Sequence, residues 1–221
     1  MKFTFFENVF TSQMNVSILV VVVLCVLAIL LGKKVKTCDY TKEPSRFMLC
    51  VESFVDLINN FCRANLGEKH FKKYAPYLFT LFTYLLISNA IGILGVSNPT
   101  QSLAITSAMA IITTGIIYWT RFRENGFVGF CKAFAEPVVV MVPLNIISVV
   151  TLPLSMGIRL FVNLISGAAF ITIGYGVLGY FAPLVMPALH LVFDLFFGAV
   201  QAFVFFLLTL INIQQELNIE E

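Results

Sequence analysis

The sequence contains little charge. Asp, Glu, Lys and Arg together make up 12% of the 221 residues, whereas 59% are hydrophobic. Soluble globular domains carry about 25% charged residues, so this composition excludes a water-soluble protein and indicates an integral membrane protein. With 14 basic and 12 acidic residues the formal net charge is only +2, which gives no indication of nucleic-acid binding.

Motifs of enzymes, cofactor sites and metal sites are also missing. The five cysteines are odd in number and include no C-x-x-C pair, so neither a zinc site nor a disulfide framework is predicted. Gly174, Gly176 and Gly179 spell a dinucleotide fingerprint, but no soluble strand precedes them, and we interpret them as a hairpin bend. The sequence has no P-loop and no nucleophile–base pair. We therefore expect a chain that is not an enzyme by itself and needs no cofactor.

Apolar runs predict helices that cross a membrane, each of which takes about 20 residues. The run at 16–31 is followed by basic residues and lacks a cleavage site, so it predicts a retained helix rather than a signal peptide. Nine of the 14 basic residues lie at 33–73, which places that stretch in the cytoplasm. Within it, apolar residues at three- and four-residue spacing predict an amphipathic helix on the membrane surface. Its apolar face consists of Phe47, Val51, Phe54, Val55, Ile58, Phe61 and Cys62.

The stretch at 137–215 is almost continuously apolar but contains Pro143, Pro153, Pro183 and Pro187. It is too long for two simple crossings, so we expect two long helical arms that are bent or strongly tilted. The predicted fold is an all-α membrane protein. It has about five transmembrane helices plus a surface amphipathic helix, and the last two transmembrane helices are long, tilted and paired as a hairpin.

The distribution of charge predicts the topology. The turn at 97–102 has no charge, whereas basic residues follow the next crossing, so the N-terminus is expected outside and the C-terminus in the cytoplasm. The expected segments are an external N-terminal segment (1–15), a first transmembrane helix (16–32), a cytoplasmic loop with the amphipathic helix (33–74), a transmembrane hairpin (75–119), a second cytoplasmic loop (120–136), the tilted hairpin that forms an ion path (137–215) and a C-terminal tail (216–221).

Titratable side chains are rare in the long apolar stretch. Apart from tyrosines, the stretch at 138–213 contains only Arg159, His190 and Asp194. A charge at the centre of a membrane helix costs about 2.5–3.5 kcal/mol on insertion scales, so each of these residues must be compensated. Either Arg159 and Asp194 neutralise each other and pin two helices together, or they belong to an ion path.

The spacing of the polar residues favours the ion path. They fall on one face of each long helix, with Arg159, Asn163 and Ser166 on the first helix and His190, Asp194 and Gln201 on the second. A fixed positive charge, a carboxylate, an imidazole that exchanges protons near neutral pH and amides that hold water suit ion translocation. A single buried acid is too few for a pump that works alone. We therefore expect another membrane subunit to complete the site.

Four motifs resemble, in the right order, subunit a of the F-type (rotary) ATP synthase, bacterial type, which is the membrane stator that faces the ring of c subunits. They lie at 87–92, at 99–103, at 143–163 around Arg159 and at 201–205. The resemblance covers most of the chain. It implies that Arg159 is a stator charge, which makes an approaching rotor carboxylate ionise and separates two offset half-channels. Ions then cannot cross the membrane without turning the ring.

The resemblance also implies roles for the neighbours of this arginine. Asn163 and Gln201 would flank the guanidinium, and Asp194 would relay the ion in the half-channel that opens to the outside. Many members of the family carry an acid or a histidine nine residues beyond the arginine, where this chain has Ala168. His190 has no role in the family pattern and lies either in the ion path or at a pore-mouth or packing position.

The remaining expectations complete this prediction. Asn145, inside the signature before Arg159, and Ser166 are added to the predicted ion path. The implied partners are the c-subunit ring, the b subunits of the peripheral stalk, membrane lipids and the translocated H⁺ or Na⁺, in a bacterial cell membrane. Two alternatives remain: a stand-alone ion-coupled secondary transporter, which predicts an internal repeat that the sequence lacks, and a membrane scaffold whose Arg159 and Asp194 only neutralise each other.

Overall fold

The computed structural model describes the chain at 2–37, 46–94, 98–135 and 142–217, and these residues are almost entirely helical. No strand occurs within those ranges, which confirms the predicted all-α fold. Three stretches among them are long and apolar enough to cross a membrane: Ser12–Val35, Leu103–Arg123 and Ile147–Leu217. The chain is therefore a multi-pass membrane protein. The last stretch has 71 residues and contains two arms.

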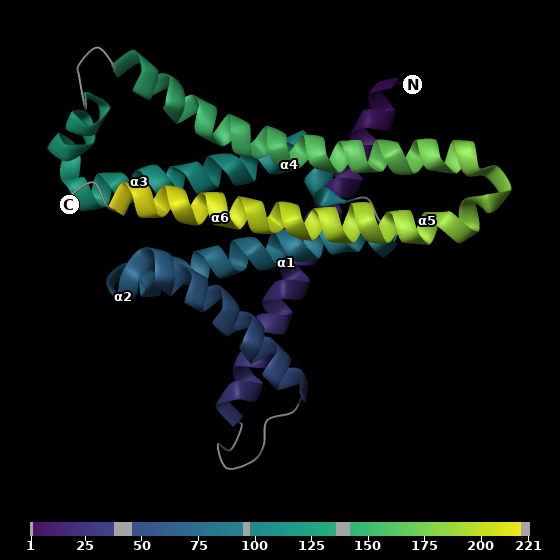
Figure 1. Ribbon diagram of the computed structural model, residues 1–221, viewed down its shortest axis with the longest axis horizontal. Coiled ribbons are helices and arrows are strands. Elements are labelled where there is room, and N and C mark those ends of the chain that lie inside the picture. Colours follow the sequence, from purple (N-terminus) through teal and green to yellow (C-terminus); the bar gives the residue numbers. More distant parts are fainter. Residues whose placement is uncertain (1, 38–45, 95–97, 136–141, 218–221) are drawn as a thin grey trace.

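Helix α1 (Lys2–Thr37) contacts α2 and crosses the direction of the hairpin arms steeply (Figure 1). The helix is continuous from Lys2 to Thr37, so it includes residues of both the predicted external segment (1–15) and the predicted first transmembrane helix (16–32). Most of its side chains between 18 and 30 are exposed, although Val20 is buried. A polar contact joins α1 to α2, because the Ser17 hydroxyl lies 2.7 Å from the Tyr84 hydroxyl.

Helix α2 (Arg46–Ala90) contains the predicted amphipathic helix in its first half. The helix is kinked at Gly67, whose φ of 67° lies in the left-handed region that glycine adopts at little cost. Ile58 and Cys62 of the first half are buried in the protein core, and the Phe54 ring packs on rings of the second half. Phe47 at the start of the helix is exposed. The predicted apolar face is thus buried in the protein core at Ile58 and Cys62 but exposed at the start of the helix.

Helix α3 (Leu103–Ala135) follows two short 3-10 turns, η1 (Ile91–Leu94) and η2 (Pro99–Gln101). The predicted loop at 120–136 is helical as far as Ala135, and the break in this helix comes at Gly126, whose φ is 66°. One side of α3 faces the protein core, where residues such as Ile117 are buried.

The long apolar stretch forms a hairpin (Figure 1). One arm is α4 (Val142–Leu178), and the other consists of α5 (Ala182–His190), the π-helix η5 (Leu191–Phe196) and α6 (Phe197–Leu217). The bend lies in η4 (Gly179–Phe181), where Gly179 has a φ of 46°. Gly174 and Gly176 remain inside α4, so the predicted bend involves only the last of the three glycines. Gly174 and Gly176 do not have a positive φ, so the helical backbone continues through them, and the chain turns at Gly179.

Helix α6 lies at the centre of the core, in contact with α2, α3 and α4. The largest fully buried side chains include Leu85 of α2, Leu160 of α4 and Phe205 and Phe206 of α6. This packing holds α4 beside α6 in an antiparallel arrangement, as Figure 1 shows. The polar stripes predicted on the two arms are thereby brought to the same region of the molecule.

Candidate ion-translocation site

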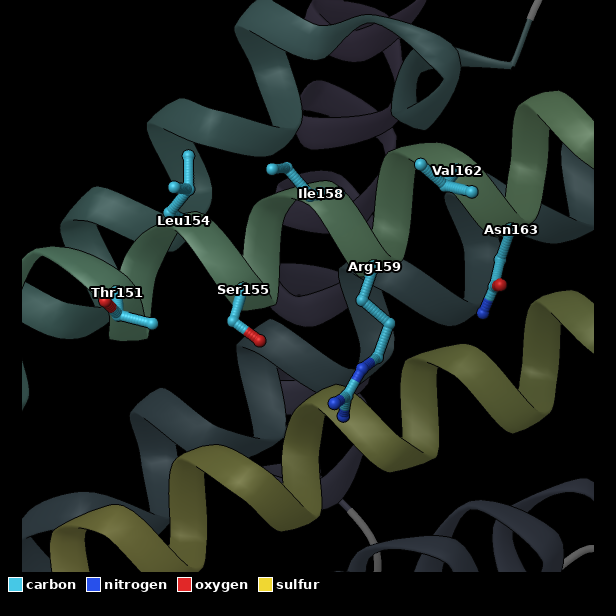
Figure 2. A pocket seen from close by; sticks show the side chains of 7 residues that line it. All are labelled: Thr151, Leu154, Ser155, Ile158, Arg159, Val162 and Asn163. Atoms are coloured by element: carbon cyan, nitrogen blue, oxygen red, sulfur yellow. The ribbon is translucent and has the colours of Figure 1, made fainter. Parts of the chain in front are cut away.

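Arg159 lies in an open groove of about 380 Å³. Figure 2 shows its side chain extending from α4 in the direction of α6, on the same side as Ser155, whereas Leu154 and Ile158 point the other way. All the lining residues belong to α4, so this helix alone forms the wall. They are Thr151, Leu154, Ser155, Ile158, Arg159, Val162 and Asn163.

The guanidinium of Arg159 has no partner within the described part of the chain. The residue is exposed, and no ion pair, hydrogen bond or ring contact involves it there. An unpaired charge is costly to hold in a membrane, and such residues normally pair with another group or face a water-filled cavity. We therefore expect the groove to be water-filled or closed by another molecule.

Asn163, one turn beyond Arg159, connects the two arms of the hairpin. Its Nδ2 donates a hydrogen bond to Oε1 of Gln201 over 2.6 Å. Gln201 is buried, and an amide in such a position needs this kind of partner. The bond fixes α4 against α6 immediately beside the arginine, so the predicted flanking residues lie together.

Asp194 pairs with His190 rather than with Arg159. The Nδ1 of His190 lies 2.6 Å from Oδ2 of Asp194, and their side chains are 26% and 14% exposed. Asp194 lies in the π-helix η5, a geometry that often occurs at functional sites. The structure therefore does not form the self-neutralising Arg–Asp pair that the scaffold alternative requires.

Tyr175 joins this pair from the opposite arm of the hairpin. Its hydroxyl lies 3.3 Å from Nε2 of His190, and the two rings are in contact, with centroids 6.0 Å apart. Tyr175 was not among the residues predicted for the ion path. The contact depends on where the hairpin bends, and three glycines at 174–179 left that position open.

A buried polar cluster lies on the other side of Asp194. Asn89 Nδ2 donates to the backbone oxygen of Gly198 over 2.8 Å, and the Thr100 hydroxyl donates to Asn89 Oδ1 over 2.7 Å. Gly92 lies against the acid, because a Cβ built there would stand 3.4 Å from Cγ of Asp194. Asn89, Gly92 and Thr100 belong to the first two motifs of the resemblance, but nothing in the sequence pointed to their contact with α6 and η5.

The chain was compared with known proteins. The family model described as ATP synthase A chain matches residues 14–214. This chain belongs to the family of F-type ATP synthase subunit a. It is 38% identical over 188 residues to "ATP synthase subunit a, sodium ion specific" of Propionigenium modestum, an alignment that covers 77% of this chain and 63% of that relative.

Other relatives in the ATP synthase subunit a family come from different bacteria. The chain is 32% identical over 166 residues to "ATP synthase subunit a 1" of Chlorobaculum parvum, covering 73% of this chain and 72% of the relative. It is 30% identical over 198 residues to "ATP synthase subunit a" of Streptococcus gordonii, covering 82% of each. The chain thus spans less than two thirds of the Propionigenium relative and more of these two.

The other predicted residues of this subunit a chain are placed as follows. Ser166 is half-buried on α4, and Ala168, at the position of the family's frequent acid or histidine, is also half-buried. Asn145 lies in α4, but its side chain is outside the described part of the structure. Within that described part, no three His, Cys, Asp or Glu side chains gather to hold a metal ion.

Proposed function

We propose that this chain is the membrane stator subunit of an F-type ATP synthase, in which it provides two offset half-channels for H⁺ or Na⁺. The ion reaches the carboxylates of the c-subunit ring through one half-channel and leaves through the other, so that ion flow turns the ring. The chain performs no ATP chemistry itself. The observation that carries this proposal is the exposed Arg159, which lies in a groove lined by one helix and has no partner in the described residues.

A carboxylate on a passing rotor helix supplies the negatively charged partner that Arg159 lacks within the described residues. An opposite charge within about 4–6 Å favours the ionised form of a carboxyl group, so the rotor acid gives up its ion as it comes close. The same positive charge repels a cation that would pass directly from one half-channel to the other. The ion must therefore ride on the ring.

The polar residues on either side of Arg159 suit two offset half-channels. Thr151 and Ser155 lie eight and four residues before the arginine on the same groove. Asn163 and Gln201, and then Asp194, lie towards the bend of the hairpin. A path that obliges each ion to cross on the rotor harvests about 2.3 kcal/mol per unit charge for every 100 mV.

The proposed partners follow from this role. The c-subunit ring closes the groove around Arg159, the b subunits of the peripheral stalk hold the stator in place, and lipids surround α1. We place the chain in a bacterial cell membrane with its N-terminus outside and its C-terminus in the cytoplasm. One relative is named for sodium ions, and the role of Arg159 is the same for H⁺ and Na⁺.

ATP-driven ion uptake into membrane vesicles that carry the intact complex tests the proposal. We expect Arg159→Ala to abolish uptake while the complex still assembles, because the barrier between the half-channels is lost. Arg63→Ala is the matched control, since Arg63 is an exposed residue of α2 in a surface ion pair with Glu68. Normal coupled uptake by the Arg159→Ala complex would show that the arginine is not the stator charge.

A further inference from the structure

Tyr175, His190 and Asp194 form a continuous polar chain near the bend of the hairpin. The two contacts, of 3.3 Å and 2.6 Å, use the two different nitrogens of the imidazole ring. A neutral histidine has one donor and one acceptor nitrogen. If the tyrosine hydroxyl donates to Nε2, then Nδ1 donates to the carboxylate, and one tautomer satisfies both bonds.

The exposure of these side chains falls from one end of the polar chain to the other. Tyr175 is half exposed, at 50%, whereas the side chains of His190 and Asp194 are 26% and 14% exposed. Tyr175 belongs to α4, and the other two residues lie at the end of α5 and in η5. The chain of contacts therefore leads from the surface of the hairpin to the acid.

Few other groups face this pair. In the part of the chain that the structure describes, Tyr175 of α4 and Asp194 of η5 are the titratable side chains that contact His190. On the other side of Asp194 lie Gly92 of η1 and the amide of Asn98, which carry no charge. Arg159 makes no contact with the pair.

We propose that His190 passes protons between the exposed end of the hairpin and Asp194, with Tyr175 positioning its ring, so that the ion in this half-channel is H⁺. This inference rests on the proposed function. It assigns a role to a histidine that the family pattern leaves without one, and it adds Tyr175 as a positioning residue.

The transfer is balanced as follows. A proton from water adds to Nε2 of His190 when the tyrosine hydroxyl moves aside, which gives an imidazolium. The proton on Nδ1 then passes to the Asp194 carboxylate and leaves a neutral ring with its hydrogen on Nε2. Once Asp194 has passed its proton on, exchange with water removes the proton from Nε2 and returns one to Nδ1, which restores the first tautomer. An imidazole suits this task because its protonation changes near neutral pH.

The same arrangement does not suit Na⁺. Hard cations take several oxygen ligands, as Ca²⁺ does, and an imidazole nitrogen is a poor substitute. Here one oxygen of Asp194 is occupied by His190, and the Tyr175 hydroxyl lies on the far side of the ring. The neighbouring Asn98 directs its side-chain oxygen to Thr100.

The test uses vesicles that carry the intact complex and measures ATP-driven uptake of H⁺ and of ²²Na⁺ between pH 5.5 and 8.5. His190→Gln keeps an amide that can hydrogen-bond but cannot carry a proton in this range. We expect it to slow H⁺ uptake by about tenfold or more and to flatten its pH dependence, because proton transfer by a positioned side chain contributes on the order of 10²–10⁴-fold. Imidazole added to the buffer should restore part of the rate.

The matched control is His70→Gln. His70 is the other of the two histidines in the chain and lies on α2 beyond the Gly67 kink. This variant should keep the wild-type rate and pH profile. Tyr175→Phe removes the hydroxyl but keeps the ring, and it should slow H⁺ uptake by about twofold to tenfold, the value of one hydrogen bond, with a shifted pH profile.

The outcomes separate this inference from the proposed function. If Arg159→Ala abolishes uptake but His190→Gln and Tyr175→Phe retain the wild-type rate and pH profile, the relay is wrong and the stator role stands. Uptake of Na⁺ instead of H⁺ by the wild-type complex also overturns the relay. If Arg159→Ala pumps normally, the proposed function itself fails. Should His190→Gln not assemble, His190→Asn and the milder Tyr175→Phe decide by their pH profiles.

Discussion

Two arginines of the membrane-spanning stretches, Arg121 and Arg159, lie in opposite surroundings. Arg121 of α3 has its Nε 3.1 Å from Oε2 of Glu216 of α6, and the two side chains are only 14% and 16% exposed. Arg159 of α4 is exposed and has no partner in the described residues. Arg121 is thus neutralised within its own chain, whereas Arg159 is left available. The comparison indicates that Arg121 serves the fold, whereas Arg159 is free for the role proposed above.

The largest effect on stability is expected from Arg121→Ala. The substitution leaves Glu216 mostly buried without its positive partner, and breaking such a pair costs about 3–5 kcal/mol. The thermal stability of the detergent-solubilised complex and the amount of this subunit in membranes measure the loss. Arg159→Ala should leave both unchanged. An equal loss for the two variants would contradict the difference drawn here between a paired Arg121 and an Arg159 that has no partner in the described residues.

The two faces of α4 are expected to differ in the same way. Leu160 is fully buried, whereas Leu154 in the groove is 58% exposed. We expect Leu160→Ala to cost about 2–3 kcal/mol, in the lower part of the range for such changes because lipid and not water surrounds the helix. Leu154→Ala should change the thermal stability by less than about 0.5 kcal/mol. A large loss for Leu154→Ala would mean that the groove face packs within the chain.

A smaller effect is expected from Asn163→Ala, which removes the internal bond nearest to Arg159. The buried amide of Gln201 then lacks its donor, at a cost of about 1–3 kcal/mol. Replacing both residues, with Asn163→Ala and Gln201→Leu, should recover part of this stability because no buried polar group is left unpaired. Thermal unfolding of the single and double variants measures the coupling, and strictly additive losses would contradict it.

The smallest expected effect concerns reactivity rather than stability. Burial raises the pKa of the Cys62 thiol to about 11, whereas Cys50 on the same half of α2 is exposed. The thiolate is the reactive form, so at pH 8 Cys62 should react with a maleimide about 100-fold more slowly than Cys50. Its rate should rise with pH up to the raised pKa. The rates are measured in chains that retain only one of the two thiols, and equal rates would show that this half of α2 leaves the core.

The sequence predicted the helices well because their causes are local. Long apolar runs and a single polar stripe on each arm are properties of consecutive residues, so the hairpin and the positions of Arg159, Asn163 and Gln201 could be inferred from spacing. The family resemblance, and not the spacing, implied that Asn163 and Gln201 lie together beside Arg159, and the structure joins them by a hydrogen bond.

The contacts around Asp194 could not be inferred in this way. Asn89 and Gly198 are 109 residues apart, and their contact depends on the packing of α2 against α6. A π-helix changes the hydrogen-bonding partner by one residue without a distinctive composition, so η5 left no signal in the sequence. Apolar residues also predicted a membrane-surface helix at the start of α2, although packing buries Ile58 and Cys62 in the protein.

The groove around Arg159 has a consequence for how this site changes over time. Residues of α4 alone line it, so in the proposed complex the complementary wall is encoded by a different gene. A substitution at Ile158 or Val162 is then acceptable or harmful only in relation to the surface that moves past it. We expect these positions to vary together with the facing residues of the rotor, while Leu160, on the opposite face of the same helix, varies with its own chain.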